Sequence, residues 1–246
     1  MGSFLGILFC GGRGKRLGKI TEYISKAFVP VYDRPVFMYP LAQLEASRQI
    51  DEIVILTNEE NDAKLRRTGY RTVIQDDARV HDMLSGLAYI REVIGDERPA
   101  ILMPCDNVSD IKVDHVVEMF HKEKPDIAIS IRRVESEAKL REMGVFDPTT
   151  GSIEYRPVRP KSKWGIIAPY IVREGLRISG TESEILNRCR ISCARYEGKW
   201  FDIGDVKSLI QSNRVLAYKL WVDEEESRDS AGRALNGKEK NSISRR

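Results

Sequence analysis

Short apolar runs typical of strands alternate with amphipathic runs typical of helices over the first half of this chain. The strand-like runs are GILF, EIVILT, AILMPC and DIAISIRR, and the helical runs between them are VFMYPLAQLEASR, VHDMLSGLAYIREVI and VDHVVEMFHK. Such alternation predicts βαβ units, because parallel strands need a crossover connection that is usually a helix. We therefore expect an α/β fold with a mostly parallel sheet flanked by helices on both faces.

The carboxyl ends of these strands are expected to hold the functional site. Crossovers between parallel strands are right-handed, so these ends meet at one edge of the sheet, where open α/β sheets bind their ligands. The strand ends are Cys10-Gly11-Gly12, Thr57-Asn58 and Cys105-Asp106. From about residue 144 the runs become shorter and are separated by turns, as in DPTTG and WGIIAPYIV. This change predicts a small β-rich insertion that returns to the sheet.

The composition indicates one large domain followed by a polar tail. The chain has 246 residues, enough to bury a sizeable core, and its apolar and charged fractions are those of a globular protein. Residues 223–246 are polar, of mixed charge and poor in large apolar groups, so they cannot build a core. We predict a domain over residues 1–222 and a disordered tail over residues 223–246.

Charge and cysteine content argue against several kinds of partner. The net charge is +3, too small to indicate a nucleic-acid partner or a membrane surface, since these need a concentrated basic face. No run is long enough to span a bilayer, and the N-terminal apolar run lacks the basic region and cleavage site of a secretory signal. The four cysteines lack the spacing of a zinc site, which indicates reduced thiols. These features together predict a cytoplasmic protein.

The first strand ends in a glycine turn, FCGGRGKRL, that carries three cations. A P-loop needs Ser or Thr after Gly-Lys, whereas Arg16 follows Lys15 here, and the dinucleotide fingerprint needs a third glycine where Leu17 stands. What remains is a turn whose backbone N–H groups can approach an anion closely, most naturally a triphosphate, with Arg16 and Lys26 to neutralise its charge. An ordinary glycine turn with solvated cations is the alternative reading of this segment alone.

The glycine turn is the first part of a longer pattern, Gly-Gly-x-Gly-x-Arg-Leu, then Ser-Lys, then Pro-Val-Tyr-x-x-Pro. The residues that supply it are Gly11, Gly12, Gly14, Arg16, Leu17, Ser25, Lys26, Pro30, Val31, Tyr32, Pro35, Tyr39 and Pro40. This segment closely resembles the opening signature of the sugar-1-phosphate nucleotidyltransferases, particularly the glucose-1-phosphate thymidylyltransferase branch. It departs at Lys15 and Cys10, where the family usually has threonine and alanine. The resemblance, which covers most of residues 4–205 in order, implies a Rossmann-like core with a sugar-binding insertion.

Two aspartates extend the resemblance. Asp106 in LMPCDNV matches the aspartate that the family has at a strand end, often as Gly-Asp-Asn, with Cys105 in place of the glycine. Asp202 in KWFDIGD matches the family's Trp-x-Asp-x-Gly. Either aspartate alone is more often a turn or capping residue. Together with the first motif they imply a Mg²⁺ site, since Mg²⁺ is usually held by one or two carboxylates and substrate phosphate.

The resemblance also implies the reaction. A phosphate oxygen of a sugar 1-phosphate would attack the α-phosphorus of a nucleoside triphosphate, and pyrophosphate would leave. Arg16, Lys26 and Asp106 are the implied catalytic residues: Arg16 would hold the β- and γ-phosphates, and Lys26 would bridge the α-phosphate and the sugar phosphate. Mg²⁺ on Asp106 and Asp202 would neutralise charge on the α-phosphate. The residues that would bind the nucleotide are Gly11, Gly12, Arg13, Gly14 and Gln75.

The sugar subsite departs from the family pattern. Where the family commonly has Glu-Glu-Lys-Pro, this chain has Glu154, Tyr155 and Arg156 before the proline. Arg156 can replace the lysine as a phosphate donor, but Tyr155 cannot replace a carboxylate that accepts two hydroxyl protons. Gly144 matches a glycine where the sugar approaches the backbone. We expect Gly144, Glu154 and Arg156 to bind the sugar phosphate, with a sugar other than plain glucose unless Glu154 compensates.

The base subsite is also altered. Gln75 matches a family glutamine that hydrogen-bonds a pyrimidine edge, which favours dTTP or UTP. A nearby glycine whose backbone touches the base in the family is replaced by Val80, unless the alignment slips there, and His81 could lie near the base. The same reaction with CTP or GTP and an unusual sugar 1-phosphate is therefore an alternative.

Two other classes of protein stay open at this point. A nucleotide-sugar-binding module without turnover would normally have lost the glycine turn, the lysine or a metal aspartate, and all of these are present. A nicotinamide-dependent enzyme needs an acidic ribose ligand about 20 residues past the glycines, and Asp33 near that spacing lies in a VYDRP turn. The predicted partners are a nucleoside triphosphate and a sugar 1-phosphate. The apolar segments PVFMYPLAQL and SLIQSNRVLAYKLWV could pair two copies in a homodimer, and core packing accounts for them equally well.

Overall fold

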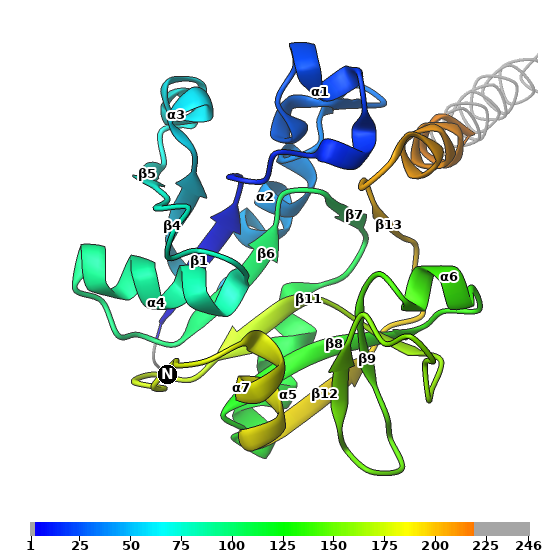
Figure 1. Ribbon diagram of the computed structural model, residues 1–246. Helices are drawn as coiled ribbons and strands as arrows, with labels where there is room; N and C mark the ends of the chain where they lie inside the picture. The colour runs from blue at the N-terminus through cyan, green and yellow to red at the C-terminus, as the bar shows by residue number, and fades with distance from the viewer. Residues whose placement is uncertain (1–2, 219–246) are drawn as a thin grey trace, which may run out of the picture.

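In the computed structural model, the described part of the chain covers residues 3–218, and one mixed sheet runs through it (Figure 1). The sheet has nine strands in the order β10-β9-β11-β6-β1-β4-β5, with β8 paired to β11 and β12 paired to β8. Their bounds are β1 Phe4–Phe9, β4 Ile50–Thr57, β5 Arg71–Ile74, β6 Ala100–Pro104, β8 Ile127–Arg133, β9 Gly144–Phe146, β10 Ile153–Tyr155, β11 Trp164–Val172 and β12 Ile191–Arg195. The predicted tail over residues 223–246 lies outside the described residues.

The half of the sheet formed by β5, β4, β1 and β6 is parallel, as the alternating runs predict. β1 lies between β4 and β6, and it is buried on both faces: Leu5 and Ile7 contact one hydrophobic core and Leu8 contacts the other. A strand with two buried faces shows no polar alternation, which explains the continuous run FLGILF. The register pairs Phe9 with Pro104, so the glycine turn after β1 and the turn after β6 lie side by side.

The other half of the sheet is joined to β6 in the antiparallel sense. β8, formed by the run DIAISIRR, does not pair with β6 because β11 lies antiparallel between them. β9 and β10 form the expected β-rich insertion, an antiparallel pair that joins the first residues of β11. The chain returns from this insertion into β11 without a helical crossover, and such a return favours an antiparallel neighbour.

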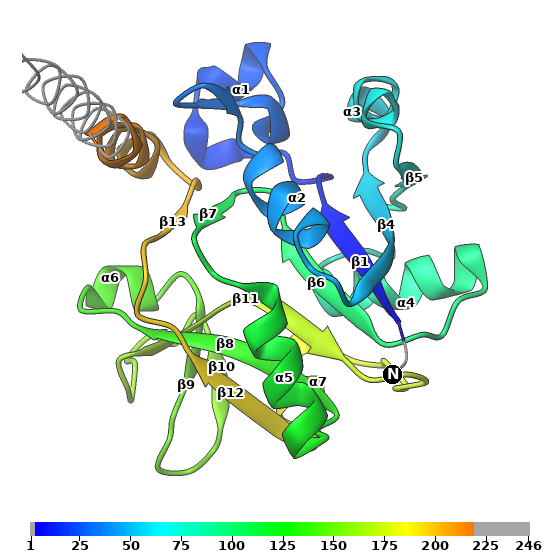
Figure 2. The same cartoon turned by 180° about the vertical axis from the view of Figure 1, so that it is seen from behind.

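Helices cover both faces of the sheet. α2 (Met38–Glu45) and α5 (Val113–Glu123) pack on the face seen in Figure 2, and α4 (Met83–Ile94) and α7 (Glu182–Arg188) pack on the face seen in Figure 1. α4 begins at a reciprocal capping box between Asp82 and Ser85, and α7 begins at one between Thr181 and Glu184. These boxes satisfy backbone N–H groups that the first turn of a helix leaves without a partner.

Short elements surround the carboxyl edge of the parallel strands. β7 (Asn107–Ser109) pairs with β13 (Trp200–Asp202), and β2 (Pro30–Val31) pairs with β3 (Arg34–Pro35). The remaining short helices are η1 Lys15–Leu17, α1 Ile20–Tyr23, η2 Lys26–Phe28, α3 Glu59–Leu65, η3 Arg66–Thr68 and α6 Glu137–Leu140, and a further helix covers residues 206–218. Within residues 3–218, none of the helices combines the length and the apolar character needed to cross a membrane.

The two apolar segments considered for a dimer contribute to the core of the chain. In PVFMYPLAQL, the side chains of Phe37, Leu41 and Leu44 are buried. In the helix over residues 206–218, Leu209 packs against a small cluster at the carboxyl edge of the sheet, while Ile210 is exposed. Core packing therefore explains much of the apolar character of the first segment. The second segment extends beyond residue 218, partly outside the described residues, and the homodimer stays a prediction.

Candidate active site

The pairing of β7 with β13 brings the two predicted metal aspartates together. Asp106 lies in the turn between β6 and β7, and Asp202 is the last residue of β13, opposite Asn107 in the β7 register. The backbone N–H of Ile203 donates to the carbonyl oxygen of Asp106 at 2.8 Å. Two segments far apart in the sequence are thus fixed side by side by backbone hydrogen bonds, at the edge predicted to hold the site.

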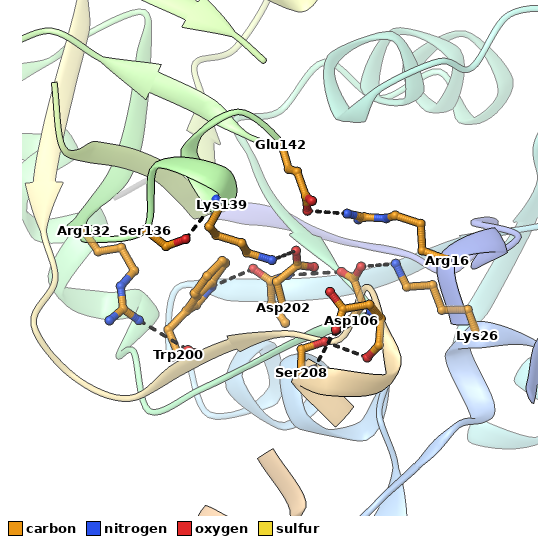
Figure 3. A network of polar contacts seen from close by, with 12 residues as sticks. Arg16, Lys26, Asp106, Arg132, Ser136, Lys139, Glu142, Trp200, Asp202 and Ser208 are labelled. Atoms are coloured by element: carbon orange, nitrogen blue, oxygen red, sulfur yellow. Dashed lines mark hydrogen bonds and ion pairs between the residues drawn. The ribbon is translucent and has the colours of Figure 1, made fainter. Parts of the chain in front are cut away.

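A lysine pairs with each of these aspartates (Figure 3). Lys26, the first residue of η2, donates to Oδ2 of Asp106, and Lys139 of α6 donates to Oδ2 of Asp202 at 2.9 Å. The Lys26 and Asp106 side chains are 15% and 14% exposed, and those of Lys139 and Asp202 are 25% and 21% exposed. Both ion pairs are mostly shielded from water, so their charges act on each other strongly.

The pKa values of Asp106 and Asp202 are shifted in opposite directions by their surroundings. Burial acts to raise the pKa of Asp106, but the charge and hydrogen bond of Lys26 outweigh it and hold that pKa below its ordinary value. Burial is also the largest influence on Asp202, and the negative charge of Asp106 adds to it, so the pKa of Asp202 is raised. Two neighbouring carboxylates that repel each other in a shielded site favour a bound cation.

These two aspartates fit Mg²⁺ by the chemistry of their oxygen donors. Within residues 3–218 no group of three or more His, Cys, Asp or Glu side chains could hold a metal ion. Mg²⁺ does not need such a cage, because it keeps several waters and is commonly bound by one or two carboxylates and substrate phosphates. Asp106 and Asp202 would therefore suffice only together with a phosphate-bearing ligand.

A hydrogen-bond chain fixes the orientation of the Asp106 carboxylate. The indole Nε1–H of Trp200 donates to Oδ1 of Asn107 at 2.9 Å, and the amide nitrogen of Asn107 donates to Oδ1 of Asp106 at 3.1 Å. An indole nitrogen can only donate, so Trp200 determines which end of the Asn107 amide faces Asp106. In the sequence this tryptophan is only the first residue of the Trp-x-Asp-x-Gly pattern. In the structure it contacts Asn107 and, through it, orients Asp106.

Arg16 lies beside Lys26, opposite Lys139 in the view of Figure 3, and contacts the segment between α6 and β9. It donates to Glu142 at 2.6 Å, with both side chains about half exposed. A Cβ on Gly204 would lie 2.7 Å from a guanidinium nitrogen of Arg16. The glycine of the Trp-x-Asp-x-Gly pattern therefore leaves room for the arginine that the first motif supplies.

The glycine turn and Gln75 form one wall of a cavity. Gln75 lies directly on Gly11, since a Cβ there would be 1.9 Å from its Oε1, whereas a Cβ on Gly12 would meet nothing within 4 Å. Gly14 adopts a left-handed conformation with φ of 62° and lies against the stem of Lys26. The cavity has a volume of about 270 Å³, and its lining includes Gly11, Gly12, Lys26, Gln75, Val80, His81, Asp82 and Asp106.

Arg13 takes part in a separate contact at the outer end of this wall. Its guanidinium donates to Asp77 at 2.7 Å, and the amide nitrogen of Gln75 donates to the other oxygen of Asp77 at 2.6 Å. Asp77 thus holds the Gln75 amide with its carbonyl oxygen toward Gly11. The expected nucleotide-binding residues lie together, and their role in binding stays a prediction.

The residues predicted for the sugar phosphate are less closely grouped. Gly144 begins β9, and a Cβ on it would lie 3.2 Å from the ring of Tyr155. Glu154 pairs with Lys161 at 2.6 Å, and it points to the opposite face of its strand from Tyr155, because successive side chains alternate. Arg156 is exposed, and within residues 3–218 no hydrogen bond or ion pair of its guanidinium is found. The structure does not bring the side chains of Glu154 or Arg156 to the aspartates.

A buried acid lies behind Tyr155. The hydroxyl groups of Tyr155 and Tyr170 are 2.8 Å apart, and Glu182, the first residue of α7, lies beside them. Burial raises the pKa of Glu182 to about 7, and the charge of Asp82 acts in the same direction while the two tyrosine hydroxyls oppose it. Its Oε1 is buried without a hydrogen-bond partner among the described residues. No pattern in the sequence points to this residue.

The two positions where cysteine departs from the family pattern are neighbours. Cys10 and Cys105 are both buried, and they follow the adjacent strands β1 and β6. Burial and then the neighbouring Cys105 thiol raise the pKa of Cys10 well above its ordinary value. Such thiols are unreactive and act as small apolar groups behind the site.

Comparisons with known proteins agree with this arrangement. The sequence profile of the MobA-like NTP transferase domain matches residues 6–151. A glucose-1-phosphate thymidylyltransferase of Actinoplanes sp. is 32% identical over 187 residues, covering 68% of this chain and 57% of that protein. A protein of Thermococcus gammatolerans, assigned as a molybdenum cofactor guanylyltransferase, is 33% identical over 72 residues, covering 29% of this chain and 35% of that protein. The chain thus spans less than two thirds of the length of these curated relatives.

Solved structures match over nearly the whole fold. A crystal structure of a Bacillus anthracis protein in complex with sucrose, assigned as a glucose-1-phosphate thymidylyltransferase, matches with a TM-score of 0.72 and 21% identity. The match covers 87% of this chain and 95% of that chain. At this identity the likeness concerns the fold alone, and it confirms the predicted α/β architecture.

Proposed function

Because the chain belongs to the MobA-like NTP transferase domain family, we propose that it transfers a nucleotidyl group from a nucleoside triphosphate to a sugar 1-phosphate. The favoured donors are dTTP and UTP. The observation that carries the proposal is the meeting of Lys26, Asp106 and Asp202 beside the glycine turn, with Arg16 next to Lys26. The Actinoplanes relative carries the name of an enzyme of this kind.

The proposed reaction is a single in-line displacement. A phosphate oxygen of the sugar 1-phosphate forms a bond to the α-phosphorus, while the bond from that phosphorus to the bridging oxygen of the β-phosphate breaks and its electron pair leaves with pyrophosphate. The nucleophile is already an anion, so no side chain has to remove a proton. The barrier lies in holding two polyanions together in line, which requires fixed positive charge and not an attacking side chain.

Arg16 and Lys26 supply this charge from the glycine-turn side of the site. Arg16 would hold the β- and γ-phosphates and align the leaving group, exchanging Glu142 for the triphosphate. Lys26 would bridge the α-phosphate and the sugar phosphate, and its pKa is raised by Asp106 against the effect of burial, so it stays charged. When bound, Mg²⁺ would be held by Asp106 and Asp202 and would neutralise charge at the α-phosphate. Loss of one such preorganised charge typically costs about 10²-fold or more in turnover.

The residues that line the cavity beside the glycine turn would determine which nucleobase binds. Gln75, Val80 and His81 all line it, and Gly86, the nearest glycine that follows, lies inside α4 against the ring of Phe9. Gly86 is therefore not among the residues that line the cavity beside Val80. The Gln75 amide favours a pyrimidine, but the changed neighbours keep CTP and GTP as alternatives, and the Thermococcus relative carries a guanylyltransferase name.

The sugar is proposed to differ from plain glucose. Glu154 cannot compensate for Tyr155, because it faces away and pairs with Lys161. The nearest carboxyl group to the Tyr155 hydroxyl comes from Glu182 instead. We also propose that the protein is cytoplasmic and that it forms a homodimer.

Pyrophosphate release tests the proposal. The purified full chain is assayed with Mg²⁺ and with dTTP, UTP, CTP, GTP and ATP, each against a panel of sugar 1-phosphates that includes glucose and other sugars, and the product is identified by phosphorus NMR. We expect release with one base and one sugar, and a loss of about 10²-fold in Lys26→Met. If no pair of substrates releases pyrophosphate although calorimetry shows that nucleotide binds, the result would instead favour a binding module without turnover.

A further inference from the structure

One cation at the reaction centre is not part of any motif in the sequence. Lys139 lies in the polar run ESEAKLREM, which shows no pattern typical of a binding site. The structure places its ammonium group 2.9 Å from Oδ2 of Asp202, as Lys26 is placed on Asp106 (Figure 3). The two lysine–aspartate pairs are therefore equivalent in kind, although only Lys26 belongs to the family signature.

We propose that Lys139 is a second catalytic lysine, which binds the phosphate of the incoming sugar 1-phosphate. This inference rests on the proposed function and deepens it. It assigns to Lys139 the contact that the sequence assigns to Arg156. The reaction itself is unchanged: the phosphate oxygen bonds to the α-phosphorus, pyrophosphate leaves with the electron pair, and Lys139 neither gains nor loses a proton.

The local structure holds Lys139 toward the site. Ser136 accepts the backbone N–H of Lys139 at the start of α6, and Glu142, three residues on, reaches Arg16. The ammonium of Lys139 also lies 5.8 Å from the centre of the Trp200 ring, and that ring already supports the chain of hydrogen bonds to Asp106. The segment from α6 to Glu142 is thus attached to the reaction centre by two ion pairs and one aromatic contact.

The charges at the site explain why Lys139 would move to a phosphate. Without a bound cation, the ammonium of Lys139 neutralises the negative charge of Asp202. A cation bound by both aspartates would neutralise that charge instead. The ammonium would then lie within reach of any phosphate that shares the cation, because a lysine has a flexible four-carbon stem. Among the described residues, the exposed Arg156 makes no comparable contact with either aspartate.

An exposed ion pair of no function is the competing explanation for Lys139. Its side chain is only 25% exposed, and it contacts a carboxylate that is 21% exposed, whereas surface pairs in the same part of the fold are much more open. Lys163, which pairs with Glu135, is 55% exposed and serves as such an example. Lys163 is therefore a matched control: it is a lysine of the same half of the sheet, and it is ion-paired with Glu135 and not with Asp202.

Separate titration of the two substrates tests this role. Lys139→Met, Lys139→Arg, Arg156→Met and Lys163→Met are compared with the wild-type chain for KM, kcat and the thermal midpoint. We expect Lys139→Met to raise the KM for the sugar 1-phosphate about 10-fold or to lower kcat about 10²-fold, with the KM for the nucleotide nearly unchanged. Lys139→Arg, which keeps the positive charge, should retain most of the activity that Lys139→Met loses, and Lys163→Met should resemble the wild type.

A binding measurement separates this inference from the proposed function. Inorganic phosphate and each sugar 1-phosphate of the panel are titrated calorimetrically into the full chain with Mg²⁺ and a non-hydrolysable UTP analogue. Binding that weakens about 10-fold in Lys139→Met but not in Lys163→Met supports the inference even if no pair of substrates turns over, in which case only the proposed function fails. If Lys139→Met binds and turns over like Lys163→Met, or if Arg156→Met alone shows the loss, the inference is wrong.

Discussion

Glu182 offers a prediction whose size follows from its surroundings. Its carboxyl group lies among Tyr155, Tyr170 and the charge of Asp82, without a cation among the described residues, and its pKa is about 7 instead of 4.5. Between these two values the folded protein keeps a proton on Glu182 that the unfolded chain has lost, so stability falls as pH rises through this window. At about 1.4 kcal/mol per pH unit, the full loss amounts to about 3 kcal/mol as an upper limit.

Glu182→Gln removes this loss without changing the shape of the side chain. The variant should match the wild type below about pH 4.5 and become more stable relative to it as the pH rises, by up to about 3 kcal/mol above pH 7. The free energy of unfolding is measured by urea denaturation at intervals between pH 4 and pH 8. A difference that stays constant over this range would refute the reasoning, because only a change of charge on Glu182 makes it depend on pH.

Glu184, two residues further along α7, provides a control with the opposite sign. Its carboxylate accepts hydrogen bonds from the backbone and the hydroxyl of Thr181, which lower its pKa. Because the pKa of Glu184 is lowered in the folded protein, its carboxylate stabilises the fold at pH values above its ordinary pKa. This stabilisation is lost as the pH falls through the lowered pKa. Glu184→Gln should therefore be less stable than the wild type at neutral pH, and the difference should shrink as the pH falls.

Three further changes test the arrangement of the site. Trp200→Phe leaves Oδ1 of Asn107 without its donor and thereby loosens Asp106. In a paramagnetic-resonance titration with nucleotide present, it should weaken Mn²⁺ binding about 10-fold, whereas Trp164→Phe should not. Glu142→Gln frees Arg16 from an exposed ion pair and should tighten nucleotide binding about two- to fivefold by calorimetry; weaker binding would contradict the role of Arg16. Gly204→Ala places a methyl group against Arg16, so the KM for the nucleotide should rise about 10-fold with an unchanged thermal midpoint, and an unchanged KM would contradict this contact.

The sequence predicted the parts of the fold that local patterns determine. The alternation of apolar runs correctly predicts the parallel strands β1, β4 and β6 and their helices, because burial on both faces leaves a continuous apolar run. The family resemblance, which the MobA-like match confirms, pointed to Asp106 and Asp202 before any contact between them was known. The pairing of β7 with β13 that joins them has no local signal, since each strand has three residues.

The rest of the site depends on side chains that no pattern marks. Lys139 and Glu142 lie in a polar run typical of a surface helix. Only the tertiary fold gives them partners, Asp202 of β13 for Lys139 and Arg16 for Glu142. Glu154 could be taken for a sugar ligand from its place beside Tyr155, but the alternation of a strand turns it toward Lys161. Tertiary contacts of this kind cannot be read from spacing along the chain.

The most direct test of the account is the rate of pyrophosphate release by Asp202→Asn, compared with the wild type on the best pair of substrates. If Asp106 and Asp202 form one reaction centre, the variant should lose about 10²-fold or more of the rate, and excess Mg²⁺ should restore part of it, while nucleotide binding without metal stays unchanged. A variant that releases pyrophosphate at the wild-type rate with the wild-type dependence on Mg²⁺ would contradict the central claim.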